Sequence, residues 1–423
     1  MGFGCMARKQ IVKGIGILLI EIGFIYFLAS SGIHNLMMLP SLGWRKQEEV
    51  WNEAKGIYEY TKGDMSILIL LYGVATILLI VAFILFWMLQ LKHAYKLQLL
   101  EEEGKNIPTL KQDFKSLLDK NLHVTLMSLP MLGILIFNIV PLLFMISMAF
   151  TNYSKENDHL ILFDWVGLKN FARVLSLNGN IGRQFWHVAG WTIIWAILAT
   201  FLNYFLGMIL ALIINRKGTH FKAFWRFCFV ISIAVPQFVS LLIMRTLLQP
   251  QGAVNAILKT SGLINSPLPF MTDAMWARVT IIIINLWIGI PYTMLQVTGI
   301  LQNIPSDLYE AAKIDGAGPV VIFFKITLPY MLFVTTPYLI TTFTGNINNF
   351  NVIYLLTGGG PTYVGDTAGQ SDLLITWLYK LTVDNKYYNI GAVIGILSFI
   401  LLSIVSLVTY RNSQSYKNEE AFK

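Results

Sequence analysis

Long apolar stretches alternate with shorter polar segments along this chain of 423 residues. A helix needs roughly 20 apolar residues to cross the hydrocarbon core of a bilayer, which is about 30 Å thick. Eight stretches reach that length, and they lie near residues 11–30, 65–90, 124–150, 188–214, 223–248, 278–303, 320–344 and 389–410. The pattern therefore predicts an all-α, polytopic membrane protein with about eight transmembrane helices.

Composition supports the same class of protein. Hydrophobic residues make up 55% of the chain and charged residues only 13%, whereas soluble domains have about 25% charged residues. The net charge of +8 is typical of the basic loops of membrane proteins, so we expect no nucleic-acid partner. Two cysteines, Cys5 and Cys228, indicate neither a disulfide framework nor a metal site.

The distribution of basic residues predicts the orientation. More than half of the 31 lysine and arginine residues fall in the N-terminus, 91–123, 215–226, 304–325 and the C-terminal tail. Basic loops stay in the cytoplasm, so both termini are predicted to be cytoplasmic. The first stretch has the flanks of a signal peptide, but seven further spans follow it, and we expect an uncleaved first helix.

A short polar helix is predicted between the sixth and seventh spans, near residues 306–316. Asp307 is expected to cap its N-terminus, with Glu310 completing a capping box. Gly316 is expected to end the helix in the left-handed conformation, and Pro319 suits the first turn of the next helix. The sequence therefore predicts a compact cytoplasmic helix between two spans.

The outward face of this helix is shallow. Leu308, Ala311, Ala312 and Asp315 recur at the spacing of one helix face. The two alanines would let another backbone approach closely, which favours a docking surface. A capped loop helix without any partner is the alternative.

The spacing of Glu310-Ala311-Ala312, Gly316 and Ile326-x-Leu328-Pro329 resembles the E-A-A-x3-G-x9-I-x-L-P signature of bacterial ABC importer permeases, in their carbohydrate-uptake branch. The resemblance implies the type I importer permease architecture and a coupling helix that docks on an ATP-binding subunit. Glu310 would then pair with a basic residue of that subunit. Ala311 and Ala312 would form the close contact, Asp315 an accessory polar contact, and Gly316 the turn.

Two membrane segments carry polar residues that suit a sugar. Residues 285–292 hold an N-x-W-x-G-x-P-Y pattern, and Asn346 and Asn349 are expected on one face of the seventh span with Thr342. Such residues either join helices or hydrogen-bond a neutral polyol. Both segments resemble those of maltose-type permeases, which implies a substrate site of Asn285, Ile288, Gly289, Tyr292, Thr342, Asn346 and Asn349. Gly345 replaces an aromatic residue of that pattern, which would widen the site.

The resemblance is to the larger membrane subunit of maltose and maltodextrin importers, and it implies a set of partners. These are a second homologous permease, two copies of an ATP-binding subunit, an extracellular sugar-binding lipoprotein, the oligosaccharide and membrane lipid. ATP and magnesium would be bound by the ATPase, with no cofactor in this chain. Residues 1–120 would form two N-terminal helices and a basic cytoplasmic linker, and residues 121–423 a six-helix permease core in the bacterial plasma membrane.

The sequence is also compatible with other functions. A galacto-oligosaccharide importer would use a closely similar permease. An ion-coupled secondary transporter could use Glu21, within the first span, as its acidic site. An intramembrane enzyme is disfavoured, because the sequence lacks the usual membrane arrangements of catalytic serine, histidine or paired aspartate. The glycine cluster at 358–360 lacks the Lys-Ser/Thr of a phosphate loop, and its resemblance to the L-L-T-x-G-G-P segment implies an outer loop that meets the binding protein.

Overall fold

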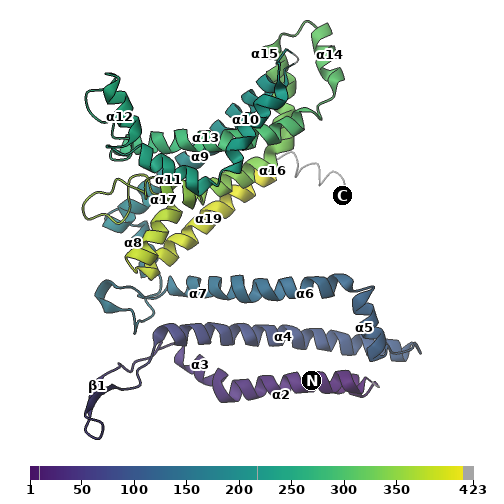
Figure 1. Cartoon of the computed structure of the whole chain (residues 1–423). Helices are drawn as coiled ribbons and strands as arrows, with labels where there is room; N and C mark the ends of the chain where they lie inside the picture. Colours follow the sequence, from purple (N-terminus) through teal and green to yellow (C-terminus); the bar gives the residue numbers. More distant parts are fainter. Residues whose placement is uncertain (9, 217, 413–423) are drawn as a thin grey trace. The chain divides into compact units, whose positions relative to one another are not determined.

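A computed structural model describes residues 1–8, 10–216 and 218–412 of the chain (Figure 1). The basic C-terminal tail, Lys9 and Lys217, which entered the orientation argument, lie outside these residues. In the described part, seven helices are long and apolar enough to cross a membrane, or eight when one bent pair is taken as a single span. The predicted polytopic, helical fold is confirmed, with one β-hairpin as a local exception.

The chain divides into two compact units, each described by itself. The first comprises Met1–Asn170 with Tyr387–Ala392, and the second comprises Phe171–Lys386 with Val393–Lys423. The third membrane helix belongs to the first unit on this criterion. The functional division at residue 120 stays a prediction.

The first unit contains three membrane helices that lie side by side in Figure 1, a hairpin and a short amphipathic helix. Its elements are α1 (Phe3–Met6), α2 (Ile11–Phe27), a π-helical segment (Leu28–Gly32), α3 (Ile33–Met38), β1 (Glu49–Asn52), β2 (Ile57–Tyr60), α4 (Ser66–Glu102), α5 (Leu110–Leu118), α6 (Leu122–Ile134), a second π-helical segment (Leu135–Ile139), α7 (Val140–Met148) and a 3₁₀ turn (Glu156–Asp158). The two strands pair antiparallel, with Glu49 opposite Tyr60. Leu42, Leu70, Val74, Tyr153 and Phe163 are buried together where α4 meets the segments around it.

Two details of the first unit bear on the sequence predictions. Helix α4 continues to Glu102, so much of the predicted linker 91–123 is helical. Glu21 accepts a hydrogen bond from the amino group of Met1. The carboxylate within the first span therefore has a cationic partner, and this contact lowers the cost of keeping it there.

The second unit is built around α9. Its elements are α9 (Asn180–Asn215), α10 (Lys222–Ala234), α11 (Gln237–Leu247), α12 (Ala253–Thr260), α13 (Ala274–Leu301), α14 (Ser306–Ile314), α15 (Pro319–Ile322), a π-helical segment (Phe323–Thr327), α16 (Leu328–Ile347), α17 (Phe350–Leu356), α18 (Leu374–Tyr379) and a further π-helical segment (Lys380–Asp384). Helix α8 (Lys169–Leu175) and α19 (Tyr388–Asn412) cross from one unit to the other. Helix α9 packs on both α13 and α16.

Small and polar residues allow α9 to pack closely. A Cβ atom on Gly207 of α9 would lie 2.6 Å from the Cβ atom of Thr293 in α13. The Tyr204 hydroxyl is 2.7 Å from the Thr335 hydroxyl of α16. Close approach through small residues and hydrogen bonds across helices is how membrane helices associate without a hydrophobic driving force. These contacts make α9 the central element that positions the polar residues of its neighbours.

The predicted fifth span, 223–248, is not a single straight helix. Helices α10 and α11 meet at an angle of 86°, and the break lies at Val235 and Pro236. Val235 is extended, with φ −78° and ψ 124°, as expected for a residue that precedes proline. The residue pattern had indicated an apolar stretch but not this bend.

Candidate functional site

Helix α14 is the short helix expected between two spans. It begins at Ser306, its N-cap residue is Pro305, and no side chain caps it. The predicted capping box of Asp307 and Glu310 is therefore wrong. Pro305 supplies the extended entry (φ −56°, ψ 130°), so the helix starts at Ser306, two residues earlier than a cap at Asp307 requires.

The C-terminal end of α14 confirms the expected glycine stop. Gly316 has a φ of +74°, and its N–H donates to the Lys313 carbonyl at 3.0 Å, while the Ala317 N–H donates to the Ala312 carbonyl at 2.9 Å. These two bonds form a Schellman motif, which satisfies the last carbonyls of a helix. Pro319 then opens α15 at its first position, as expected.

Most of α14 faces away from the rest of the unit. Glu310, Ala311 and Asp315 are exposed, and Ala312 is half-buried. Ile314 is 86% exposed, an unusual position for a large apolar side chain, beside Leu308 at 45%. Exposed apolar side chains rimmed by polar ones mark interaction surfaces. The geometry leaves this face available for a partner.

One side chain holds α14 against the membrane helices. Tyr309 packs on the core cluster formed by α9, α13 and α16, and its hydroxyl is 3.2 Å from the Thr327 hydroxyl in the π-helical segment that leads into α16. A cavity of about 700 Å³ lies beside it, lined by Tyr309, Glu310 and Lys313 among others. Helix α14 is therefore linked directly to the start of α16.

A polar cluster that sequence reasoning missed joins the helix ends next to this cavity. The Asn215 amide of α9 donates to the Thr298 hydroxyl of α13 at 3.3 Å, and its oxygen accepts from the Arg226 guanidinium of α10. In the sequence, this cluster is indicated only by a polar residue at each of two span ends. The cluster joins helices α9, α10 and α13 near the attachment of α14.

The residues predicted to bind sugar fall into separate groups. On α13, Gly289 faces α9, because a Cβ atom there would lie 2.5 Å from the Asn203 amide nitrogen. Asn285 is buried on the same helix. Ile288 and Tyr292 instead line a small cavity of about 20 Å³ with Gln237 and Ser240 at the α10–α11 bend. Tyr292 is 49% exposed, so its ring is available to a ligand.

The residues of the seventh span that were predicted to bind sugar also lie in different environments. The buried side-chain amide of Asn346 donates to the Thr200 hydroxyl of α9 at 3.0 Å, and the backbone carbonyl of Asn346 accepts from the Trp195 indole at 3.0 Å. Helix α16 ends at Ile347, and Asn349 caps α17 by accepting from the Val352 N–H. The expectation that Asn346 and Asn349 share one helix face is therefore wrong, since the helix breaks between them. Thr342 is half-buried on α16, and a Cβ atom on Gly345 would meet open space.

The segment after α17 is held by a buried carboxylate that no sequence pattern singled out. Asp372 is fully buried. One of its oxygens lies 2.7 Å from both the Lys380 ammonium and the Gly369 N–H, and the other accepts from the Thr376 hydroxyl at 2.8 Å. Burial raises the pKa of the Asp372 carboxyl above its usual range, and the Lys380 ammonium opposes that shift. The buried Asp372–Lys380 ion pair therefore holds the loop in one conformation.

Two further side chains anchor the same loop to the membrane helices. Gln184 of α9 accepts from the backbone N–H groups of Thr367 and Ala368 at 2.9 and 2.8 Å. Arg278 of α13 donates to the Gln370 carbonyl at 2.9 Å and lies 4.6 Å from the centre of the Trp191 ring. Tyr363 and Val364 precede these contacts and follow Pro361, whose carbonyl accepts from the Gln370 N–H at 2.8 Å; they are 59% and 106% exposed. The loop thus presents an exposed tip on a fixed base.

The close contact at Gly289 gives a direct test of helix packing. We expect Gly289→Ala to lower the thermal stability of the purified protein, because the added methyl group would collide with the Asn203 amide and overpacking costs about 1–3 kcal/mol. Gly299→Ala on the same helix is the control, since nothing lies within 4 Å of its Cβ position. Equal unfolding temperatures for the two variants would contradict this contact.

Comparison with known families defines the class of protein. Residues 203–415 match the family described as "binding-protein-dependent transport system inner membrane component". The chain belongs to this family, and it has the fold of an ABC importer permease. It is a membrane subunit of a transport system. Membership in a binding-protein-dependent family disfavours the alternative of an ion-coupled secondary transporter that uses Glu21.

Individual relatives cover nearly the whole chain. It is 38% identical to the galactooligosaccharides transport system permease protein GanP of Bacillus subtilis, over 99% of this chain and 96% of GanP. It is 35% identical to the maltodextrin transport system permease protein MdxF of the same organism, over 99% and 95%. The maltose/maltodextrin permease MalF of Escherichia coli is 38% identical over 58% of this chain and 48% of MalF.

Solved structures support the fold. A bacterial ABC transporter involved in the import of the acidic polysaccharide alginate matches with a TM-score of 0.57 and 21% identity, covering 71% of this chain and 98% of that one. At that identity the likeness concerns the fold alone.

Proposed function

We propose that this chain is the permease subunit of an ATP-driven importer that moves maltose and maltodextrin-type oligosaccharides into the cell by alternating access. The observation that carries the proposal is α14, an exposed helix between two spans that Tyr309 ties to the start of α16. Membership in the binding-protein-dependent family and the maltodextrin relatives support it.

In this proposal α14 docks on an ATP-binding subunit and transmits its motion to the membrane helices. Ala311 and Ala312 would supply the close contact, with the exposed Leu308 and Ile314 beside them, Glu310 setting the register and Asp315 adding a polar contact. An exposed ion pair contributes only about 0–1 kcal/mol, so the apolar contact would carry most of the binding. From α14 the motion would reach α16 through Tyr309 and Thr327, and α9 through Asn346 and Thr200.

The remaining partners follow from the same proposal. A second homologous permease would complete the pathway, and two copies of the ATP-binding subunit would hold ATP and magnesium. A sugar-binding lipoprotein would deliver the oligosaccharide at the outer side, where the loop around Tyr363 and Val364 is exposed. A relative in fold has been solved with a sugar-bound periplasmic protein, which supports a partner of this kind. Both termini would be cytoplasmic, in a bacterial plasma membrane.

Galacto-oligosaccharides are the second candidate substrate, favoured by the 38% identity to GanP over nearly the full chain. The test is ATP hydrolysis by the complete complex in liposomes, with the binding protein present and each sugar added separately. Stimulation by maltodextrins and not by galacto-oligosaccharides is expected. The reverse result would move the assignment to galacto-oligosaccharides, and uptake that needs a membrane potential but no ATP would overturn the importer proposal.

Tyr292 offers the cleanest test of the sugar site, because its ring is half-exposed and lines the small cavity at the α10–α11 bend. We expect Tyr292→Ala to raise the sugar concentration for half-maximal ATP hydrolysis about tenfold, as loss of an aromatic contact costs of the order of 1–1.5 kcal/mol. Phe399→Ala, at a 67% exposed position of α19, is the control. If the sugar concentration for half-maximal ATP hydrolysis is unchanged in Tyr292→Ala, this residue does not contact the sugar and serves in helix packing.

A further inference from the structure

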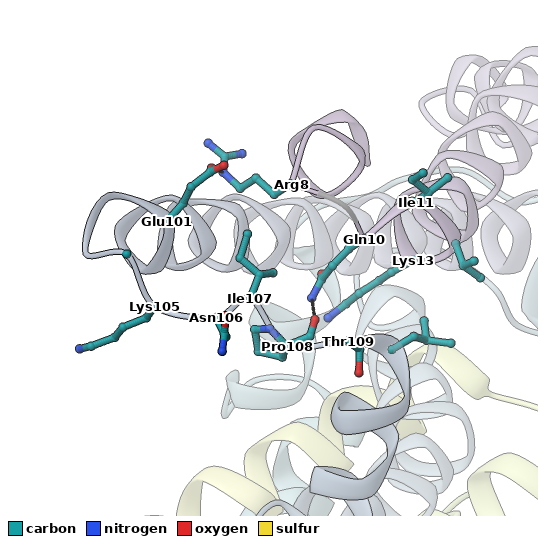
Figure 2. A pocket seen from close by; sticks show the side chains of 13 residues that line it. Arg8, Gln10, Ile11, Lys13, Glu101, Lys105, Asn106, Ile107, Pro108 and Thr109 are labelled. Atoms are coloured by element: carbon teal, nitrogen blue, oxygen red, sulfur yellow. Dashed lines mark hydrogen bonds and ion pairs between the residues drawn. The ribbon is translucent and has the colours of Figure 1, made fainter.

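A cavity of about 700 Å³ lies in the first unit, between the start of α2 and the segment that leads from α4 into α5 (Figure 2). Arg8 and Gln10 approach it from the N-terminal side, and residues 104–110 close it from the other. Among the residues that the structure describes, Arg8, Lys13 and Lys105 are the basic residues that line it, and Glu101 is the acidic one. Nothing in the transport mechanism uses this cavity.

Two polar atoms at the cavity, one on Gln10 and one on Arg8, make no hydrogen bond. Gln10 is only 7% exposed, and its amide nitrogen donates to the Pro108 carbonyl at 2.7 Å, as Figure 2 shows. Its oxygen is buried without a hydrogen bond. The Nε atom of Arg8 also makes no hydrogen bond, but it is ion-paired with Glu101, whose nearer oxygen lies 3.4 Å away. Buried polar groups are normally satisfied. The cavity therefore offers one acceptor and one cationic donor to a ligand.

The surroundings place the cavity at the boundary between lipid and water. The Lys13 ammonium, in the first turn of a membrane helix, is 2.8 Å from the Asp113 carboxylate of α5 and 2.9 Å from His93 of α4. These bonds hold α5 at the level where α2 begins. Ile11 and Val12, which line the cavity, are 57% and 67% exposed.

Helix α5 has the character of an interfacial helix. Phe114 and Leu118, one turn apart, are 61% and 72% exposed, and Lys111 and Lys115 lie on the same short helix. A helix with an exposed apolar face and lysines beside it lies in the membrane interface. This observation is independent of the cavity, and it points to phospholipid at the same level.

We propose that the cavity binds the head group of an anionic phospholipid whose head group carries a hydroxyl, the chemistry of phosphatidylglycerol. The phosphate accepts from Arg8 Nε, and the head-group hydroxyl donates to the Gln10 oxygen. The acyl chains run along Ile11 and Val12. A choline lipid has neither a net negative charge nor a head-group donor, so it leaves the Gln10 oxygen unmatched.

The test is lipid binding to the full transporter complex in detergent, followed by native mass spectrometry with phosphatidylglycerol or phosphatidylcholine added. We expect saturable binding of phosphatidylglycerol, and an affinity about tenfold lower in Arg8→Gln, since this variant loses a charge-assisted hydrogen bond to the phosphate. Gln10→Glu should lower it similarly, because a carboxylate would face the phosphate. Should that variant fail to assemble, Gln10→Leu removes the acceptor without adding charge.

Arg45→Gln is the matched control, because Arg45 is an exposed arginine of the same unit that does not line the cavity. Its lipid affinity should equal that of the unchanged protein. Equal affinity for the two lipids, or unchanged binding in both the Arg8 and Gln10 variants, would overturn the proposal. Displacement of the lipid by millimolar inorganic phosphate would assign the cavity to a free anion instead.

Discussion

Gly316→Val is expected to abolish most sugar-stimulated ATP hydrolysis by the assembled importer while leaving the chain inserted in the membrane. Gly316 has a φ of +74°, a region in which a β-branched residue is a strong outlier. The cost for an L-residue there is about 1–2 kcal/mol, and the chain can avoid it by unwinding the last turn of α14. The Schellman bonds and the position of Ala312 would then be lost, and we expect activity to fall about tenfold or more.

The cause is conformational, and matched variants can show this. No atom lies within 4 Å of the Cβ position of either Gly316 or Gly318. Gly318 has a φ of −73°, which valine adopts readily, so Gly318→Val should retain activity. Gly316→Asn should retain a large part of it, because asparagine tolerates the left-handed region. Full activity in Gly316→Val would show that the helix stop is not needed for coupling.

Lys380→Met is expected to disorder the loop that follows α17. The substitution leaves the fully buried Asp372 carboxylate without its cation. Breaking a buried ion pair in this way costs about 3–5 kcal/mol. We expect protease cleavage within residues 357–373 and a marked loss of transport, measured on the complete complex at neutral pH.

Acidification should partly restore this variant. Burial already raises the pKa of Asp372, and loss of the Lys380 ammonium removes the main influence that opposes the rise. A carboxyl whose pKa is higher in the folded state than in the unfolded state gains stability as the pH falls through the folded value. Protection from protease should therefore return at mildly acidic pH.

The controls separate charge from size. Lys259→Met removes an exposed lysine of α12 and should leave the loop protected. Lys380→Met combined with Asp372→Asn removes both charges and should be less harmful than Lys380→Met alone. Cleavage that is equally fast for the single and double variants, at every pH, would contradict the ion-pair explanation.

The membrane helices and α14 could be predicted from the sequence because both depend on local rules. Apolar length determines a span, so even the bent α10–α11 pair was found as an apolar stretch. The left-handed stop at Gly316 and the start of α15 at Pro319 depend only on the conformations that these two residues favour. The N-terminus of α14 was misjudged because Pro305 supplied the entry geometry in place of a capping side chain.

The substrate site was harder to predict, because tertiary contacts decide what a polar side chain does. Periodicity placed Asn346 and Asn349 on one face, yet the helix ends at Ile347, and Asn349 becomes the cap of α17. Gly289 was selected for a sugar and packs on Asn203, a residue 86 positions earlier in the chain (289 − 203). The ion pair of Asp372 and Lys380 has no sequence signature beyond two charges near a glycine-rich segment.

The anchoring of the loop that follows α17 has a consequence for the speed and strength of docking. Gln184, Arg278 and Asp372 hold residues 368–370 on its C-terminal side, and the Pro361 carbonyl on its N-terminal side accepts from the Gln370 N–H, while Val364 projects fully into solvent. Ordering a backbone residue costs about 1–2 kcal/mol in conformational entropy, and here that loss accompanies folding of the chain. A protein that binds at Tyr363 and Val364 therefore contacts a preorganised surface. Its association is opposed mainly by its own loss of translational, rotational and conformational entropy.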